Sequence, residues 1–128
     1  MNQAAVGKVY PETPFTVDPD RVAAFRAVFG EAEGVPITFA TVAEFTIIPH
    51  VVADPELGMD FSRVLHGTQR YAYERPLREG ETLAIRSTIE SIRSLGANAL
   101  LVLATELVEP DGAVVCKAWS TLIERAEA

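Results

Sequence analysis

Residues 35–52 read VPITFATVAEFTIIPHVV, and this stretch decides how the rest of the chain is interpreted. Its apolar side chains fall on nearly every face of a helical wheel, with one charged residue, Glu44, which is typical of a buried helix. Pro36 suits a first helical turn, whereas Pro49 should end or kink the helix. A strand is the alternative, because threonine and valine are poor helix formers, but the stretch is long for a strand. We therefore predict a buried helix over residues 36–52.

The size and composition of the chain indicate one compact domain over residues 1–128. The chain is 48% apolar and carries 18 acidic against 11 basic residues, a net charge of −7. An acidic chain without a basic run is a poor binder of nucleic acid or of anionic membranes. The single cysteine, Cys116, cannot form an internal disulfide, and no signal peptide or membrane span is recognised, so we expect a cytoplasmic protein. No spacing of metal ligands or cofactor motif is present, so none is expected.

The residues before the long helix predict a loose start, an edge strand and a short helix. Residues 1–8 have no clear pattern, and residues 9–17 contain two prolines, which favour an extended edge segment. Asp18 is suited to cap a helix that begins at Pro19 and ends at Gly30. The expected apolar stripe of this helix is Val22, Ala24, Phe25, Val28 and Phe29.

After the long helix the pattern changes to β-strands. Strands are predicted over residues 64–75, about 83–92, 99–108 and 114–123, with a bulge between Ile89 and Ile92 and a hairpin at 109–112. Four antiparallel strands joined by short turns form a meander with one face to cover. The helix over 36–52 is the only large apolar object that can cover it, so we predict an α+β hot-dog domain. Such sheets often pair edge to edge, which predicts at least a dimer.

Residues 64–81, VLHGTQRYAYERPLREGE, resemble the MaoC-like dehydratases, and most closely their N-terminal half. Residues 35–39, VPITF, resemble the start of the central helix in that half, and residues 111–123 resemble its closing hairpin. The resemblance covers about residues 7–125. It implies a hot-dog domain of (R)-specific enoyl-thioester hydratases and 3-hydroxyacyl-thioester dehydratases, which act on acyl chains carried by CoA or acyl carrier protein.

The resemblance also implies which half this chain corresponds to. Catalytic halves carry an Asp and a His, in a D-x4-H motif, just before the central helix. Here the corresponding stretch, residues 29–36, has neither residue, and Asp60 and His66 follow the helix at a different spacing. The chain therefore resembles the non-catalytic half. It would work as a homodimer or as a heterodimer with a catalytic MaoC-like chain.

Two residues are candidates for chemistry, each with a structural alternative. His66 lies within the most family-like motif, where it could contact the acyl thioester or act as an acid or base, or could simply fix the backbone. Glu44 could act as a base or nucleophile, because burial raises the pKa of a carboxyl group toward the useful range. Its alternative is an ion pair at the helix rim with Arg70 or Arg75.

Other residues are candidates for binding the acyl chain. Thr38, Thr41 and Phe45 share one face of the predicted helix and could line a tunnel or pack against the sheet. The remaining substrate-binding candidates are Phe39, Gly67 and Gln69, beside His66. For three further sets of residues a structural role is the simpler expectation. His50 should lie at the end of the helix, and Cys116 should be a buried, inert thiol. Arg70, Arg75 and Arg78 should lie on a solvated strand rather than bind a phosphate.

Three functions are compatible with these residues. The first is a hydratase or dehydratase subunit that completes the acyl tunnel of a catalytic partner. The second is a homodimeric hot-dog acyl-CoA thioesterase that uses Glu44. The third is a non-catalytic protein that binds acyl thioesters.

Overall fold

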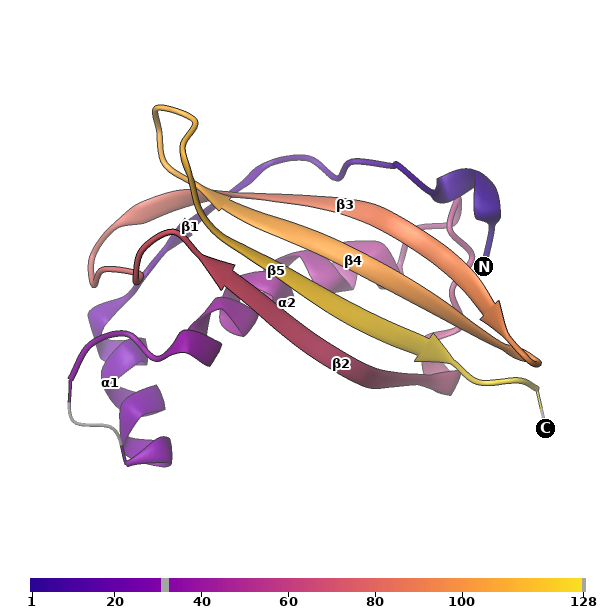
Figure 1. The fold of residues 1–128 in the computed structure, drawn as a ribbon, viewed down its shortest axis with the longest axis horizontal. Coiled ribbons are helices and arrows are strands. Elements are labelled where there is room, and N and C mark those ends of the chain that lie inside the picture. The colour runs from indigo at the N-terminus through magenta and orange to yellow at the C-terminus, as the bar shows by residue number, and fades with distance from the viewer. Residues whose placement is uncertain (31–32, 128) are drawn as a thin grey trace.

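The computed structural model describes residues 1–30 and 33–127 and shows one five-stranded antiparallel sheet with a long helix against one face (Figure 1). The strands are β1 (Thr13–Thr16), β2 (Val64–Tyr73), β3 (Thr82–Leu95), β4 (Asn98–Val108) and β5 (Val114–Glu124). The helices are α1 (Pro19–Phe29) and α2 (Ala40–Val52), with 3₁₀ turns η1 (Gln3–Ala5), η2 (Ile37–Phe39) and η3 (Phe61–Arg63). The predicted α+β hot-dog architecture is confirmed. No helix in the described part of the chain is long and apolar enough to cross a membrane.

The short helix α1 begins and ends where the sequence predicts. The Asp18 side chain accepts a hydrogen bond from the backbone N–H of Asp20, and Gly30 adopts the left-handed conformation at φ 72°. The predicted apolar stripe is only partly correct, because Val22 is buried while Val28 and Phe29 are exposed. The polar residues 31–34 also predict a short link into the long helix, and this link lies partly outside the described residues.

The central helix begins later than predicted and ends at the predicted residue. The 3₁₀ turn η2 precedes it, so regular α-helix begins at Ala40 rather than at Pro36. Pro49 lies inside the helix, which continues to Val52, so the proline does not end it. Residues 37–52 nevertheless form one continuous helical segment beneath the sheet.

The central helix is buried on one face only, whereas the sequence predicts a helix buried all round. Ala43, Glu44 and Ile47 face the sheet and are inaccessible or nearly so. Phe39 is 1% exposed and packs against the rings of Phe15 and Phe25. Phe45, in contrast, is 61% exposed. A helix that lies on a single sheet has only one side covered by its own chain, so its apolar outer face remains open.

The strand order corrects the predicted meander. The order is β1-β3-β4-β5-β2, so β2 pairs with β5 and not with β3, its neighbour in sequence. Between β2 and β3 the chain therefore passes from the β2 edge of the sheet, past the positions of β5 and β4, to the position beside β1. The predicted bulge is confirmed between Ile89 and Ser91, and a second bulge lies between His66 and Thr68.

The N-terminal residues, predicted to be loose, are fixed along the sheet. Backbone N–H of Gly7 donates to the carbonyl of Ile89 at 2.8 Å. Lys8 Nζ lies 2.7 Å from Asp54 Oδ2, and Tyr10 Oη donates to the same oxygen at 2.8 Å. These contacts tie residues 1–10 to β3 and to the end of α2.

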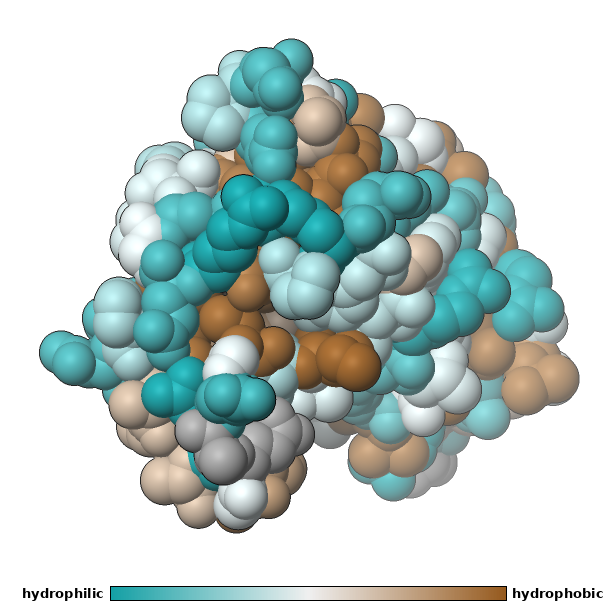
Figure 2. Space-filling view, turned by 60° about the vertical axis from the view of Figure 1, so that its left-hand side comes forward, coloured by the Kyte–Doolittle hydropathy of each residue, from teal (hydrophilic) through white to brown (hydrophobic). Residues whose placement is uncertain are grey.

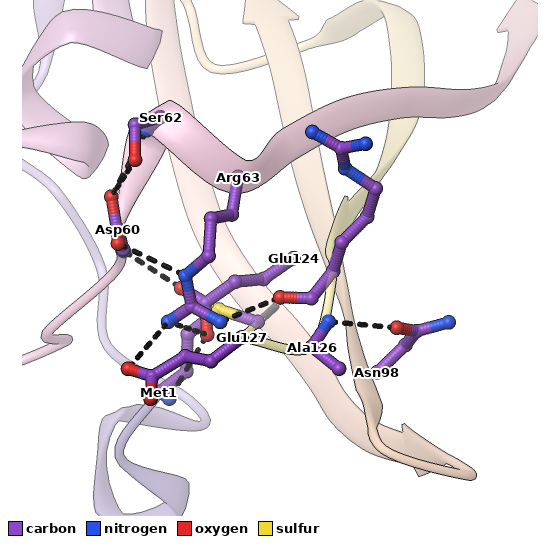
Figure 3. Close-up of polar contacts among 9 residues, drawn as sticks. Met1, Asp60, Ser62, Arg63, Asn98, Glu124, Ala126 and Glu127 are labelled. Carbon is purple, nitrogen blue, oxygen red and sulfur yellow. Dashed lines mark hydrogen bonds and ion pairs between the residues drawn. The ribbon is translucent and has the colours of Figure 1, made fainter.

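The end of β5 is joined to η3 by a second polar cluster (Figure 3). The backbone N–H of Asp60 donates to Glu124 Oε2 at 2.7 Å. Arg63 bonds Asp60 and the carbonyl of Arg125, at 3.0 and 2.6 Å, and its Nη2 lies 3.9 Å from Glu124 Oε1. Asp60 was compared above with the Asp of the family's D-x4-H motif. Its hydrogen bonds instead fix the backbone just before the start of β2.

Candidate functional site

A hollow opens between α2 and β2, on the exposed side of the helix. It has a volume of about 210 Å³. Its apolar lining is Phe45, Ile48, Phe61, Val64 and Leu122, and its polar lining is Thr41, His66, Gln69 and Ser120. A second hollow of about 300 Å³ adjoins it toward α1 and shares four of these residues, Thr41, Phe45, His66 and Gln69. Figure 2, which brings the α1 end forward, shows apolar surface lying open between hydrophilic rims.

The bulge in β2 explains why two of its polar residues face the same hollow. Side chains normally alternate across a strand, so residues three apart point to opposite faces. The register of β2 against β5 shifts between His66 and Thr68, which adds one residue and places His66 and Gln69 on the same side. A Cβ on Gly67 would lie 2.9 Å from Ile123 Cδ1. The absence of a side chain at Gly67 therefore leaves room for Ile123 beside the bulge, and a contact of Gly67 with a ligand stays a prediction.

Glu44 lies beneath the hollow, and both oxygens of its carboxyl group are hydrogen-bonded. Its side chain is 0% exposed. Gln69 Nε2 donates to Glu44 Oε1 at 2.8 Å, and Ser120 Oγ lies 2.6 Å from Glu44 Oε2. Ser120 Oγ also lies 2.6 Å from Gln69 Oε1, so the three side chains form a closed ring. The predicted ion pair of Glu44 with an arginine is wrong.

Burial sets the protonation of Glu44. Desolvation raises its pKa to about 7, and the hydrogen bonds from Ser120, Gln69 and Thr41 oppose this rise only in part. No arginine or lysine in the described chain forms an ion pair with it. The Thr41 hydroxyl is also hydrogen-bonded to Tyr71 Oη, which links the helix to β2 beside the ring.

The structure brings most of the predicted binding residues together. Thr38, Thr41 and Phe45 line the second hollow, as their shared helix face predicts. His66 and Gln69 line both hollows. Phe39 lines neither of them, because it packs in the core, and its role in substrate binding stays a prediction.

Two of the three arginines of the motif, Arg70 and Arg75, have structural partners. The guanidinium of Arg70 lies 4.1 Å from the centre of the Trp119 ring on the outer face of the sheet. Arg75 Nη2 bonds both Glu81 and Glu109, at 2.7 and 2.6 Å, and so ties β3 to the β4–β5 hairpin. The simpler expectation, that these residues do not form a phosphate site, fits these contacts.

The remaining candidates lie away from the hollow or are inert. His50 is exposed in the last turn of α2. Cys116 is buried, and burial raises the pKa of its thiol to about 11, so the thiol is poorly nucleophilic. Within residues 1–30 and 33–127, no group of three or more His, Cys, Asp or Glu side chains is placed to hold a metal ion.

Sequence reasoning missed Ser120, Tyr71 and Phe61. Ser120 interrupts the apolar inward face of β5, between Ala118 and Leu122, and that interruption is the signal that could have identified it. Its contact with Glu44 spans 76 residues and depends on the strand order, which the sequence did not predict.

Comparisons with known proteins agree with this architecture. Residues 19–118 match the family described as "FAS1-like, dehydratase domain region". A UPF0336 protein of Streptomyces coelicolor is 34% identical over 144 residues, which cover 98% of this chain and 96% of that protein. A UPF0336 protein of Leifsonia xyli is 35% identical, with coverage of 99% and 97%.

Several solved structures with similar folds are dehydratases or hydratases. The HadBC (3R-hydroxyacyl-ACP dehydratase) complex of Mycobacterium tuberculosis gives a TM-score of 0.81 at 20% identity, over 93% of this chain and 96% of that chain. A MaoC-like dehydratase gives 0.82 at 20% identity, over 97% of this chain but 43% of its own. An (R)-hydratase from A. caviae gives 0.61 at 15% identity, over 91% and 94%. These likenesses establish the hot-dog fold, and the chain belongs to the family described as "FAS1-like, dehydratase domain region", together with the UPF0336 proteins.

Proposed function

We propose that this chain is a subunit of an (R)-specific enoyl-thioester hydratase or 3-hydroxyacyl-thioester dehydratase. It supplies a wall of the acyl pocket, while a catalytic MaoC-like partner supplies the Asp and His that move protons. The ligand is an acyl chain carried by CoA or acyl carrier protein. The proposal makes the protein a single-domain, cytoplasmic partner subunit that uses no cofactor.

One observation carries the proposal: the hollow has an apolar lining but lacks an acid–base pair. Among the described residues that line the two hollows, His66 is the only histidine, and no carboxylate lines either of them. Water addition to an enoyl thioester requires a base for the water and an acid for C2. The hollow therefore suits the binding of an alkyl chain better than the chemistry at its thioester end.

The free edge of β2 supports a partner. Within the described chain β2 pairs only with β5, so its other edge is open to a further strand. Phe45, Phe61 and Leu65 expose large apolar side chains on or beside this edge. Exposed apolar surface of this kind marks an interaction site. The similar HadBC structure is itself a complex, which fits a two-chain enzyme.

The thioesterase alternative is not favoured by the geometry. A nucleophilic or basic Glu44 would need a free carboxylate oxygen facing the substrate. Both oxygens are instead occupied by Gln69 and Ser120, and the side chain is buried.

Activity measurements with and without a partner test the proposal. The purified chain should not hydrate crotonyl-CoA or longer enoyl-CoAs, because positioned acid–base groups contribute about 10²–10⁴-fold each. Mixed with a MaoC-like chain that has an intact D-x4-H motif, it should form an active heteromer. The catalytic chain alone gives the background rate.

Two histidine variants sharpen this test. His66→Ala should weaken turnover of the heteromer modestly, because His66 lines the pocket without supplying the reaction's acid or base. His50→Ala, at an exposed position in α2, is the matched control and should have no effect. Robust hydration by the isolated chain that His66→Ala abolishes would place the catalytic site here and contradict the proposal.

A further inference from the structure

The ring beneath the hollow contains three hydrogen-bond contacts. When Glu44 is ionised, the members of the ring have only two protons to place in these contacts. The three contacts join Gln69 to Glu44, Ser120 to Glu44, and Ser120 to Gln69. The Ser120 hydroxyl has one proton, and the Gln69 amide can direct one N–H into the ring. With an ionised carboxylate, two oxygens would face each other at 2.6 Å without a proton between them. A proton on Glu44 supplies the third hydrogen bond.

Reversing the amide of Gln69 does not change this count. In the reversed orientation the amide N–H donates to Ser120, Ser120 donates to Glu44, and the Gln69 oxygen then faces the other carboxyl oxygen. That contact also lacks a proton unless Glu44 carries one. Both orientations therefore close only around a neutral acid, and in each every donor within the ring has an acceptor.

We infer that Glu44, Gln69 and Ser120 form an uncharged floor under the hollow, which selects a plain alkyl chain and which loses this ligand when Glu44 ionises. The inference takes the acyl ligand from the proposed function. A closed ring engages the Ser120 hydroxyl and one N–H of Gln69, two groups that line the hollow, so the floor offers no charge to a polar substituent. An ionised Glu44 would break the ring and place an unpaired charge beneath an apolar ligand.

Among the residues that the structure describes, no other titratable group pairs with Glu44 to neutralise its charge. Tyr71 and His66 lie on β2, Cys116 lies on β5, and the buried inward-facing residues of β3 and β4 are apolar or hydroxyl side chains. The pKa of both Tyr71 and Cys116 is raised, so neither carries a charge at neutral pH. On α2 itself, His50 is exposed. The raised pKa of Glu44 agrees with the proton count.

Infrared spectroscopy of the whole chain tests the neutral acid without any ligand. At about pH 6 the carboxyls of Asp54, Asp60 and Glu81 are ionised, since their pKa values are lowered. We expect a carboxylic-acid carbonyl band that weakens toward pH 8.5 and is missing in Glu44→Gln. The same band in both proteins, or no band in the native chain at pH 6, would overturn the inference.

Ligand binding tests the consequence of ionisation. Decanoyl-N-acetylcysteamine is a suitable probe, because this thioester has no titrating group and any pH dependence comes from the protein. Its affinity for the native chain should fall about tenfold between pH 6 and pH 8, the change expected when only the neutral form binds. Glu44→Gln keeps all three hydrogen bonds without titrating, so it should bind the probe equally at both values. Equal pH profiles of the two proteins would overturn the inference.

The two experiments separate the inference from the proposed function. Absence of probe binding at both pH values, in both proteins, would count against the acyl pocket itself. Absence of the Glu44 infrared band would count against the neutral ring, whether or not the probe binds.

Discussion

Glu44, on α2, and Asp54, two residues after the end of α2, are both buried carboxyl groups, yet their surroundings are opposite. Glu44 is 0% and Asp54 9% exposed. Asp54 receives hydrogen bonds from Lys8, Tyr10 and the backbone N–H of Glu56. Glu44 has only the uncharged partners Gln69, Ser120 and Thr41.

The difference shows that a neighbouring cation, more than the extent of burial, decides whether these two carboxyl groups are charged. Lys8 and Tyr10 lower the pKa of Asp54, while burial raises that of Glu44 to about 7. Asp54 therefore stabilises the fold above its unfolded pKa and loses this contribution in acid. Glu44 has the opposite sign, because the folded state binds its proton more tightly than the unfolded state.

The largest effect on the free energy of unfolding is expected from a buried carboxylate that has neither a cationic partner, as Asp54 has, nor hydrogen-bond partners, as Glu44 has. Phe39→Asp would place such a group in the core, where Phe39 packs against Phe15 and Phe25. An unpaired buried charge costs several kcal/mol, a large share of a typical free energy of unfolding, so we expect this variant not to fold. Circular dichroism melting measures the loss.

Phe45→Asp is the matched control. Phe45 is exposed on the same helical segment, so this variant should keep a cooperative melt close to that of the native chain. Equal melting of both variants and the native chain would show that the helix is not the core.

Changing the pH gives the next largest effect. The pKa of Glu44 rises from 4.5 in the unfolded reference to about 7, so its contribution is complete below about pH 4.5 and is lost as the pH rises through 7. At about 1.4 kcal/mol per pKa unit, the loss amounts to about 3 kcal/mol. Urea unfolding at pH 5 and pH 8 measures it. In Glu44→Gln this decline should be absent, and a native chain that is more stable at pH 8 would contradict the assignment.

Removing one member of the ring should have a smaller effect. Ser120→Ala takes one hydrogen bond from Glu44 and one from Gln69, and we expect a loss of about 1–3 kcal/mol at pH 5. Ser94→Ala, at an exposed strand position, is the control and should change the free energy of unfolding little. Indistinguishable urea midpoints for the two variants would show that the ring contributes nothing to stability.

The smallest effect on stability is expected at Asp54, the carboxyl group that is paired with Lys8. Tyr10→Phe removes one hydrogen bond from Asp54 but leaves Lys8 in place, so the loss should be about 1 kcal/mol. Because that bond helps to lower the pKa of Asp54, acid unfolding of Tyr10→Phe should begin at a higher pH. An acid transition at a lower pH than in the native chain would contradict this account.

The sequence predicted elements that depend on local chemistry. Asp18 and Gly30 bound α1, the bulge lies after Ile89, and the hairpin lies at 109–112, because caps, strand phase and turns are determined by neighbouring residues. His66 and Gln69, which the motif identifies as binding candidates, both line the hollow, and their contact with a ligand stays a prediction.

Features that depend on distant partners were not predicted. The pairing of β2 with β5 leaves no local signal, so the ring partners of Glu44, 25 and 76 residues away, could not be identified. The exposure of Phe45 was missed for a related reason. Its apolar character predicts burial, but the surface that would cover it is not part of this chain's own core.

The crossing between β2 and β3 has a consequence for the time course of folding. Because β2 borders only β5, the second strand made has no neighbour until the last strand is complete, whereas β3, β4 and β5 can pair through tight turns. Contacts between residues far apart in sequence form slowly, since a long loop must close first. The hairpins should therefore acquire protection from hydrogen exchange early in refolding and β2 late. The hollow between α2 and β2, and the ring of Glu44, Gln69 and Ser120 beneath it, would then be the last parts of the native state to form.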